Sequence, residues 1–135
     1  MAAAVEVMAE KAAENSSIEI TTEVDALDQS WNFDEQMGIY RILQECLNNA
    51  IKHANATQIA ILAIEHAPNL DLIVQDDGVG FSPGQASASL DSGMGLGNIR
   101  ERARILGGSI RIDSNPGLGA CLTISVPIPT SQSNA

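Results

Sequence analysis

Cysteine is scarce in this chain: Cys46 and Cys121 are the two among its 135 residues. Two cysteines cannot build a disulfide framework, and neither stands in a Cys-x-x-Cys or Cys/His zinc pattern. One bridge between them is formally open, but two buried thiols in a reducing compartment is the simpler interpretation. His53 and His66 lie far apart in the sequence without companion ligands, so the sequence indicates no structural zinc.

Basic residues are also few, with 7 lysines and arginines against 17 acidic side chains and a formal net charge of −10. Nonspecific binding to nucleic acid or to an anionic membrane requires a positively charged surface. The charge balance therefore argues against both kinds of partner.

Long apolar segments are missing as well. No run approaches the roughly 20 residues of a membrane helix. Glu6 and Glu10 lie where a signal peptide would have a basic start and an apolar core. We expect one cytoplasmic domain, which leaves open a membrane anchor elsewhere in a longer protein.

The first half of the chain predicts two helices and a strand between them. Residues 2–14 are rich in alanine and glutamate and favour a helix that stops at a polar break. Residues 18–23 alternate apolar and polar side chains, which is typical of a half-exposed strand. From about Asp34 to Ala54, apolar residues recur at helical spacing and predict the longest helix.

The second half predicts four strands, a long loop and a shorter helix. Strands are expected at 58–64 and 70–76, followed by a glycine- and serine-rich loop over 77–97. Asn98 and Glu101 stand in a capping-box-like relation at the head of a helix. Gly107-Gly108 ends that helix, and two further strands flank a turn at 116–119. Three arginines of this helix are expected to face solvent or to pair with Glu101: Arg100, Arg102 and Arg104. The order of elements favours an α+β fold with one mixed or antiparallel sheet and helices on one face.

Glu45, Asn49 and Lys52 share one strip of the longest helix. At about 100° per residue, Asn49 lies near +40° and Lys52 near −20° from Glu45, beside the apolar face. A carboxylate, an amide and an ammonium group are thus neighbours, although an ordinary solvated face explains the same spacing. His53 falls within the apolar arc, where a partly buried structural histidine is the simpler interpretation.

A strand runs directly into Asp76-Asp77-Gly78-Val79-Gly80. A carboxylate at a strand end can accept a hydrogen bond from an exocyclic amine such as that of adenine. The two glycines permit positive φ and the close approach of a flat ligand. A tight Asp-Gly hairpin turn is the alternative, and it is weakened because no returning strand follows directly.

Glycines alternate again in Gly93-Met94-Gly95-Leu96-Gly97, directly before the second helix. Backbone N–H groups at a helix start, together with the helix dipole, form a local anion site that could hold phosphate in an acidic chain. A flexible hinge would use the same glycines. The segment is not a Walker A loop, because no Gly-Lys-Ser/Thr follows.

In this order, the three motifs resemble the catalytic ATP-binding domain of sensor histidine kinases, in the superfamily of DNA gyrase B, Hsp90 and MutL. The run GLGNIRERARILGGSIRIDSNPGLG is most similar to the nitrate-sensor and DesK-like subgroup. The resemblance covers residues 15–128 and implies a Bergerat-type two-layer α/β sandwich. Residues 1–14 would then be the end of a preceding dimerisation helix or a linker, and residues 129–135 a disordered tail.

The resemblance also implies roles for single residues. Asn49 would coordinate Mg²⁺, and Lys52 and His53 would lie near the phosphates of ATP. Glu45 would order the water of the metal or act as a catalytic base. Asp76 would accept the adenine amino group. The glycine-rich positions complete the nucleotide-binding set: Gly78, Gly80, Gly93, Gly95, Leu96 and Gly97.

A short ATP lid would span Phe81–Met94. The chain departs from the family in two respects. Family members often carry threonine where this chain has Ala120, and Thr123 is the candidate to take its place at the adenine end. Neither His53 nor His66 matches a phosphoacceptor motif, so the chain is expected to lack its own phosphorylation target.

The resemblance therefore implies an ATP–Mg²⁺-dependent protein-histidine kinase domain. It would transfer the γ-phosphoryl group to a histidine on a dimerisation domain absent from this chain, and a response regulator would then receive the phosphate. The isolated domain is expected to be a monomer without nucleic-acid or membrane contacts. An anti-sigma-factor-like serine kinase is the alternative, as is an ATP-sensing module without transfer, which the intact Glu45, Asn49 and Asp76 disfavour.

Overall fold

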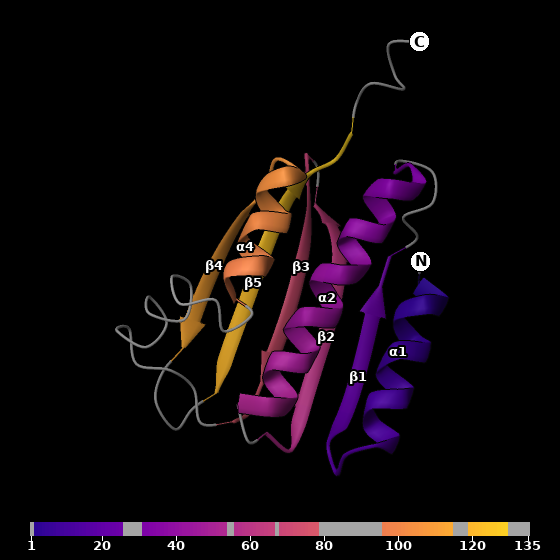
Figure 1. The fold of residues 1–135 in the computed structure, drawn as a ribbon, viewed down its shortest axis with the longest axis vertical. Coiled ribbons are helices and arrows are strands. Elements are labelled where there is room, and N and C mark those ends of the chain that lie inside the picture. Colours follow the sequence, from indigo (N-terminus) through magenta and orange to yellow (C-terminus); the bar gives the residue numbers. More distant parts are fainter. Residues whose placement is uncertain are drawn as a thin grey trace.

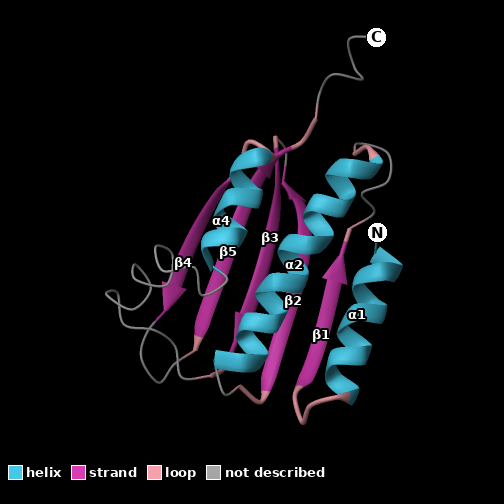
Figure 2. Ribbon diagram, viewed as in Figure 1, coloured by secondary structure: helices cyan, strands magenta, loops and turns pink. Residues whose placement is uncertain are grey.

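The described segments form one sheet with its helices packed on one face (Figures 1 and 2). This arrangement confirms the expected two-layer α+β architecture. None of the described helices combines the length and hydropathy needed to span a bilayer. The computed structural model describes residues 2–25, 31–53, 56–66, 68–78, 96–114 and 119–129.

Most predicted elements are present, with shifted ends. β2 and β3 extend beyond the predicted strands, and the connection between them is correspondingly shorter. The elements are α1 Ala2–Glu14, β1 Glu19–Val24, α2 Phe33–His53, β2 Gln58–His66, β3 Asn69–Asp76, α4 Leu96–Ile105, β4 Ser109–Ser114 and β5 Ala120–Pro127.

The sheet is mixed, with strand order β1-β2-β3-β5-β4. β1 and β2 are parallel, and the other neighbouring pairs are antiparallel. Asp76 is the last residue of β3 in both of its ladders, since it pairs with Ile59 of β2 and with Ala120 of β5. The end of β3 therefore lies at an edge of the sheet where backbone pairing stops.

Alternation along the strands separates a helix-covered face from an open one. On β3, Leu70, Leu72 and Val74 are buried under the helices, and the side chains between them point to the open face. α1 joins the same core, because Val5 and Ala9 are buried against the rest of the layer. Large side chains on every covering helix are fully buried, as are several on the strands: Val5, Ile39, Ile42, Leu43, Leu47, Ile59, Ile61, Leu70, Leu72, Ile99 and Ile124.

A reciprocal capping box begins α2. The backbone N–H of Glu35 donates to Oδ1 of Asn32 at 2.8 Å, and the N–H of Asn32 donates to Oε1 of Glu35 at 2.9 Å. Two N–H groups that a helix start leaves unpaired are satisfied in this way. The sequence places the helix start at Asp34, one residue after the observed first residue Phe33.

Asn32→Ala is expected to lower the free energy of unfolding by about 1 kcal/mol, because it removes the cap and leaves the N–H of Glu35 without its partner. Urea denaturation measures the change. Asn48→Ala is the matched control, since Asn48 is exposed in the interior of α2 and alanine there is neutral or slightly stabilising. Equal effects of the two substitutions would contradict the capping role.

The sequence predicts the end of α4 correctly but not its start. The predicted cap at Asn98 is wrong, because the helix already begins at Leu96 and includes Gly97. The predicted end is confirmed. Gly107 has φ +80°, and the N–H groups of Gly107 and Gly108 donate to carbonyls of the last turn at 2.9 and 2.8 Å. This is the Schellman pattern, which favours glycine at the left-handed position.

Candidate functional site

The last turn of α2 and the end of β3 lie at the same end of the molecule (Figure 1). α2 ends at His53, and β2 begins soon afterwards at Gln58. The start of β2 pairs with the end of β3, through Ile59 and Asp76. The helix strip and the strand-end carboxylate, which are far apart in the sequence, thus reach one edge of the sheet.

α4 runs antiparallel to α2, so its first turn points toward the same end (Figure 1). Leu106, just after α4, packs against Gly38 near the start of α2. Arg102, one turn earlier in α4, lies beside Glu45 farther along α2. Continuing this path places Leu96, the first residue of α4, toward the C-terminal turns of α2. The start of α4 therefore faces the part of α2 that carries the strip, on the side of the molecule toward the end of β3.

Asp76 is the buried charged residue of this edge, and its side chain is on the helix-covered face with 9% exposure. Burial raises the pKa of its carboxyl above the ordinary value, and the negative charge of Asp77 acts in the same direction. Hydrogen bonds from the N–H groups of Gly78 and Ala120 act in the opposite direction. The Gly78 bond measures 2.8 Å to Oδ1. Because a carboxylate has about four lone-pair sites, acceptor capacity is left for a ligand.

The three residues of the strip on α2 differ in exposure. Glu45 and Asn49 are half-buried and Lys52 is exposed. The amide nitrogen Nδ2 of Asn49 is buried and has no hydrogen-bond partner among the described residues. A buried amide without a partner is costly, so the position is suited to a ligand that satisfies it.

Arg102 is a site residue that the sequence did not single out. It was expected to face solvent or to pair with Glu101. Its Nε instead lies 3.7 Å from Oε1 of Glu45 on α2, and that Nε is buried. Arg104 is the arginine that pairs with Glu101, at 2.6 Å. The guanidinium of Arg102 thus forms an ion pair that links α4 to the strip on α2.

Thr123 does not replace a side chain at position 120. Ala120 is buried on the helix-covered face beside Asp76, its partner in the register. Thr123 is an odd number of residues away on β5 and points to the opposite face, where its hydroxyl lies 4.0 Å from the sulfur of Cys121. The adenine end of the described site therefore has no threonine from β5.

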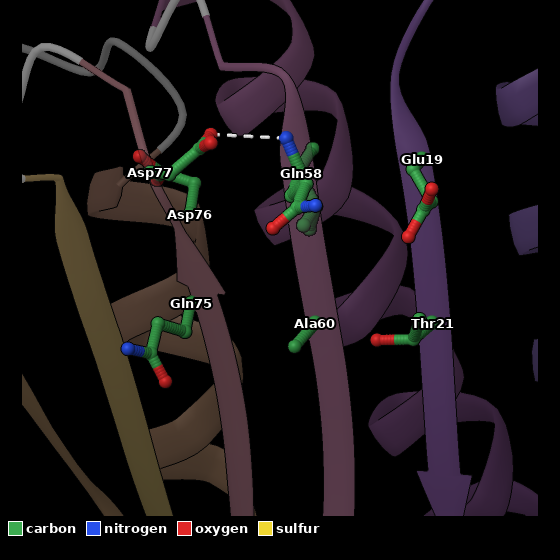
Figure 3. A pocket seen from close by; sticks show the side chains of 8 residues that line it. Glu19, Thr21, Gln58, Ala60, Gln75, Asp76 and Asp77 are labelled. Carbon is green, nitrogen blue, oxygen red and sulfur yellow. Dashed lines mark hydrogen bonds between the residues drawn. The ribbon is translucent and has the colours of Figure 1, made fainter.

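A shallow depression of about 180 Å³ lies on the open face of the sheet, behind this site (Figure 3). Side chains of three strands line it, among them Glu19, Thr21 and Gln75. These exposed polar residues are on the face that the helices leave uncovered. Asp76 and Asp77 also line it, so the depression borders the candidate site at the end of β3.

The two cysteines are free. Cys46 is buried in α2, and burial, helped by the neighbouring charge of Glu45, raises the pKa of its thiol to about 12. Cys121 is half-buried rather than buried as expected. A thiol with such a high pKa is not a nucleophile at neutral pH, which agrees with the absence of a cysteine-nucleophile motif in the sequence.

Several predicted site residues lie outside the described segments. These are Gly80, Gly93 and Gly95, together with the predicted lid Phe81–Met94. Gly97 is described as the second residue of α4, and His53 as the last residue of α2. Among the described residues, no group of three or more histidine, cysteine, aspartate or glutamate side chains is arranged to hold a metal.

Sequence relatives of this chain are kinases. ComP, a sensor histidine kinase of Bacillus subtilis, is 38% identical over 99 residues, which are 73% of this chain and 13% of ComP. UhpB of Salmonella typhimurium, a signal transduction histidine-protein kinase/phosphatase, is 35% identical over 106 residues, 73% of this chain and 20% of UhpB. The chain therefore spans a fifth or less of the length of these two relatives.

A solved structure and a family model agree with these relatives. The ATP binding domain of PrrB from Mycobacterium tuberculosis has a TM-score of 0.77 at 20% identity, covering 95% of this chain and 93% of that one. This likeness confirms the expected fold. The model of the family "Histidine kinase-, DNA gyrase B-, and HSP90-like ATPase" matches residues 34–130. The chain therefore belongs to the histidine kinase-, DNA gyrase B- and HSP90-like ATPase family, as its motifs predict, and these curated relatives within it are sensor kinases.

Proposed function

We propose that this chain binds ATP with Mg²⁺ as the catalytic domain of a two-component sensor histidine kinase. The observation that carries the proposal is the buried Asp76 carboxylate at the end of β3, with Gly78 beside it and α2 packed over the strand. Two backbone N–H groups orient this carboxylate, and its free acceptor sites suit the exocyclic amine of adenine.

Asn49 is the residue that fits the metal. Mg²⁺ prefers oxygen ligands and is usually bound through one or two protein oxygens together with phosphates and water. The orphaned amide of Asn49 supplies such an oxygen after rotation about its last bond. Bound Mg²⁺ would neutralise phosphate charge in a chain whose formal net charge is −10.

In the proposed reaction, the bond between the γ-phosphorus and its bridging oxygen breaks, ADP leaves with the bonding electrons, and a histidine nitrogen on another domain forms the new P–N bond. Such transfers depend mainly on positioning and charge neutralisation. Lys52 and His53 would lie along the phosphates, and the N–H groups at Leu96 and Gly97 would add the positive end of the α4 dipole. Glu45 would order water or act as a base, held in place by Arg102.

The remaining parts of the proposal concern the whole protein. The acceptor histidine would belong to a dimerisation domain of the full-length kinase, and a response regulator would receive the phosphate. The isolated domain would be a cytoplasmic monomer. We assign residues 15–128 to the ATPase domain, and α1 to a preceding segment that docks on it, since Val5 and Ala9 of α1 are buried in the shared core.

Mixing the domain with the dimerisation domain of its full-length protein and γ-labelled ATP tests the transfer. We expect label on the dimerisation domain that is stable in base and lost in acid, as a phosphohistidine is. Acid-stable label would favour the serine-kinase alternative. Nucleotide binding without any label would favour the ATP-sensing module.

Chelation of Mg²⁺ is expected to weaken ATP binding by about tenfold, because the metal offsets charge repulsion and joins Asn49 to the phosphates. Asn49→Ala should bind ATP in the chelator about as well as the unaltered chain does, and lose most of the gain from Mg²⁺, because alanine has no oxygen to offer the metal. Calorimetry with and without the chelator measures both effects.

Asn48→Ala is the matched control, since Asn48 is the exposed neighbour of Asn49 on α2. It should retain the Mg²⁺ dependence of the unaltered chain. Metal-independent affinity in the unaltered chain would contradict the assignment of Asn49.

A further inference from the structure

Asp77 makes a clamp between the end of β3 and the start of β2 (Figure 3). Its Oδ1 accepts hydrogen bonds from the backbone N–H groups of Thr57 and Gln58 at 2.8 and 2.9 Å. Its Oδ2 accepts a third from the hydroxyl of Thr57 at 2.6 Å. In the other direction, the N–H of Asp77 donates to the carbonyl of Gln58 at 3.3 Å. One side chain thus joins two strands by three bonds.

The clamp lies directly beyond the last residue pair of the ladder between β2 and β3. Asp76 is the last residue of β3 that pairs with either neighbouring strand. The terminal pair of a ladder frays most readily, and the side chain that must be held still here is on that terminal residue. Asp77 fastens the backbone one residue beyond Asp76.

Charge strengthens these bonds. The hydroxyl of Thr57 and the N–H groups of Gln58 and Thr57 lower the pKa of the Asp77 carboxyl, so it is ionised throughout the neutral range. Hydrogen bonds to an ionised carboxylate are stronger than those between neutral groups. Asp77 is exposed, so the hydrophobic core does not depend on it.

The residues on both sides of Asp77 are those proposed to receive the base. Asp76 would accept the adenine amine, and Gly78 donates to the carboxylate of Asp76 at 2.8 Å. Asp77 itself is directed away from them, toward β2. A shift of the Asp77 backbone would therefore move both neighbours together.

We propose that Asp77 is a positioning residue for adenine recognition: its clamp on Thr57 and Gln58 fixes the direction in which Asp76 presents its carboxylate. This inference rests on the proposed binding of adenine by Asp76. It assigns to Asp77 no contact with the nucleotide.

The test compares ADP with inosine diphosphate, which has an oxygen in place of the exocyclic amine of adenine. The preference for ADP over inosine diphosphate therefore reports on the contact with Asp76. Asp77→Ala is expected to lower ADP affinity about tenfold while changing inosine diphosphate affinity much less, so the preference falls. A merely structural role would weaken both nucleotides equally and leave the preference unchanged.

Asp77→Asn is the rescue variant. Its amide oxygen can still accept from both backbone N–H groups, and its NH₂ can donate to the hydroxyl of Thr57. We expect it to restore most of the preference for ADP. Loss of preference in Asp77→Asn as complete as in Asp77→Ala would overturn the geometric role.

Asp25→Ala is the matched control, because Asp25 makes a similar clamp at the opposite end of β2. Its Oδ2 accepts from the N–H of Glu65 at 2.9 Å, and its N–H donates to the carbonyl of Ala63 at 2.8 Å. This variant should retain the full preference, and loss of preference here would contradict a local effect of Asp77. If the unaltered chain itself does not prefer ADP, the adenine assignment of Asp76 fails; if it does and Asp77→Ala keeps that preference, only the positioning role fails.

Discussion

Asp76→Asn is expected to weaken ADP binding by about two orders of magnitude. The backbone N–H groups of Gly78 and Ala120 would hold the amide oxygen of the asparagine. Its NH₂ would then face the adenine amine, so two donors would meet where a donor and an acceptor met before. Losing a hydrogen bond to a charged group costs about 1.5–3 kcal/mol, and the unpaired donors add to this. Calorimetric titration with ADP measures the change.

Measurements of stability and of the pH dependence of ADP binding distinguish this loss of affinity from unfolding of the variant. Burial raises the folded-state pKa of Asp76, so the protonated form is favoured by folding, and stability from this group is lost as the pH rises through the raised pKa. At neutral pH the unaltered chain therefore carries a cost that Asp76→Asn removes, and the variant should be at least as stable. ADP affinity of the unaltered chain should fall as the pH is lowered toward the raised pKa, whereas that of the variant should change little there.

Asp113→Asn is the matched control, because Asp113 is exposed on β4 and pairs with Arg111 at 2.9 Å. It should bind ADP as the unaltered chain does. Unchanged ADP affinity in Asp76→Asn would contradict the assignment of the adenine contact, and a lower free energy of unfolding in that variant would contradict the pKa argument.

Local periodicity explains why much of the fold was predictable. The apolar spacing of α2 and the alternation in β2 and β3 are properties of neighbouring residues, and each places its buried face correctly. The same periodicity put Glu45, Asn49 and Lys52 on one strip beside the buried face, where Glu45 and Asn49 are half-buried and Lys52 is exposed. The C-terminal end of α4 could be predicted for the same reason, because its hydrogen bonds join residues only a few positions apart.

Features that depend on contacts between residues far apart in the sequence could not be predicted from local periodicity. The position of β5 between β3 and β4 is set by pairing across the chain, and a strand pattern does not name its neighbour. Arg102 is expected from the sequence to face solvent or to pair with Glu101, because arginine is usually exposed. Its spacing of three from Ile99 and four from Leu106 was the available signal, since Ile99 belongs to the core and Leu106 packs against it. The unpartnered amide of Asn49 and the three hydrogen bonds to Asp77 could not be predicted from spacing, because they depend on how distant segments pack.

Gly119→Ala is expected to destabilise the chain by about 2–4 kcal/mol and to lower ADP affinity about tenfold. Gly119 has φ +92°, a conformation that alanine adopts only with strain. A Cβ there would also lie 2.2 Å from the carbonyl oxygen of Asp76, so the end of β3 would have to move. Urea denaturation and ADP titration of the folded variant measure the two effects.

Alanine substitutions at two glycines after α4 distinguish the effect of backbone strain from that of steric overlap. Gly107 shares the positive φ of Gly119, at +80°, but a Cβ there would be 3.4 Å from the side chain of Pro127. Gly107→Ala should therefore show the conformational cost alone, about 1–2 kcal/mol. A Cβ at Gly108 would lie 2.3 Å from the carbonyl oxygen of Ser125, a similar overlap away from the site. Gly108→Ala should destabilise the chain and leave ADP affinity of the folded protein unchanged. If Gly119→Ala did the same, the close approach to Asp76 would matter for folding but not for recognition, and the link between this glycine and the adenine contact would fail.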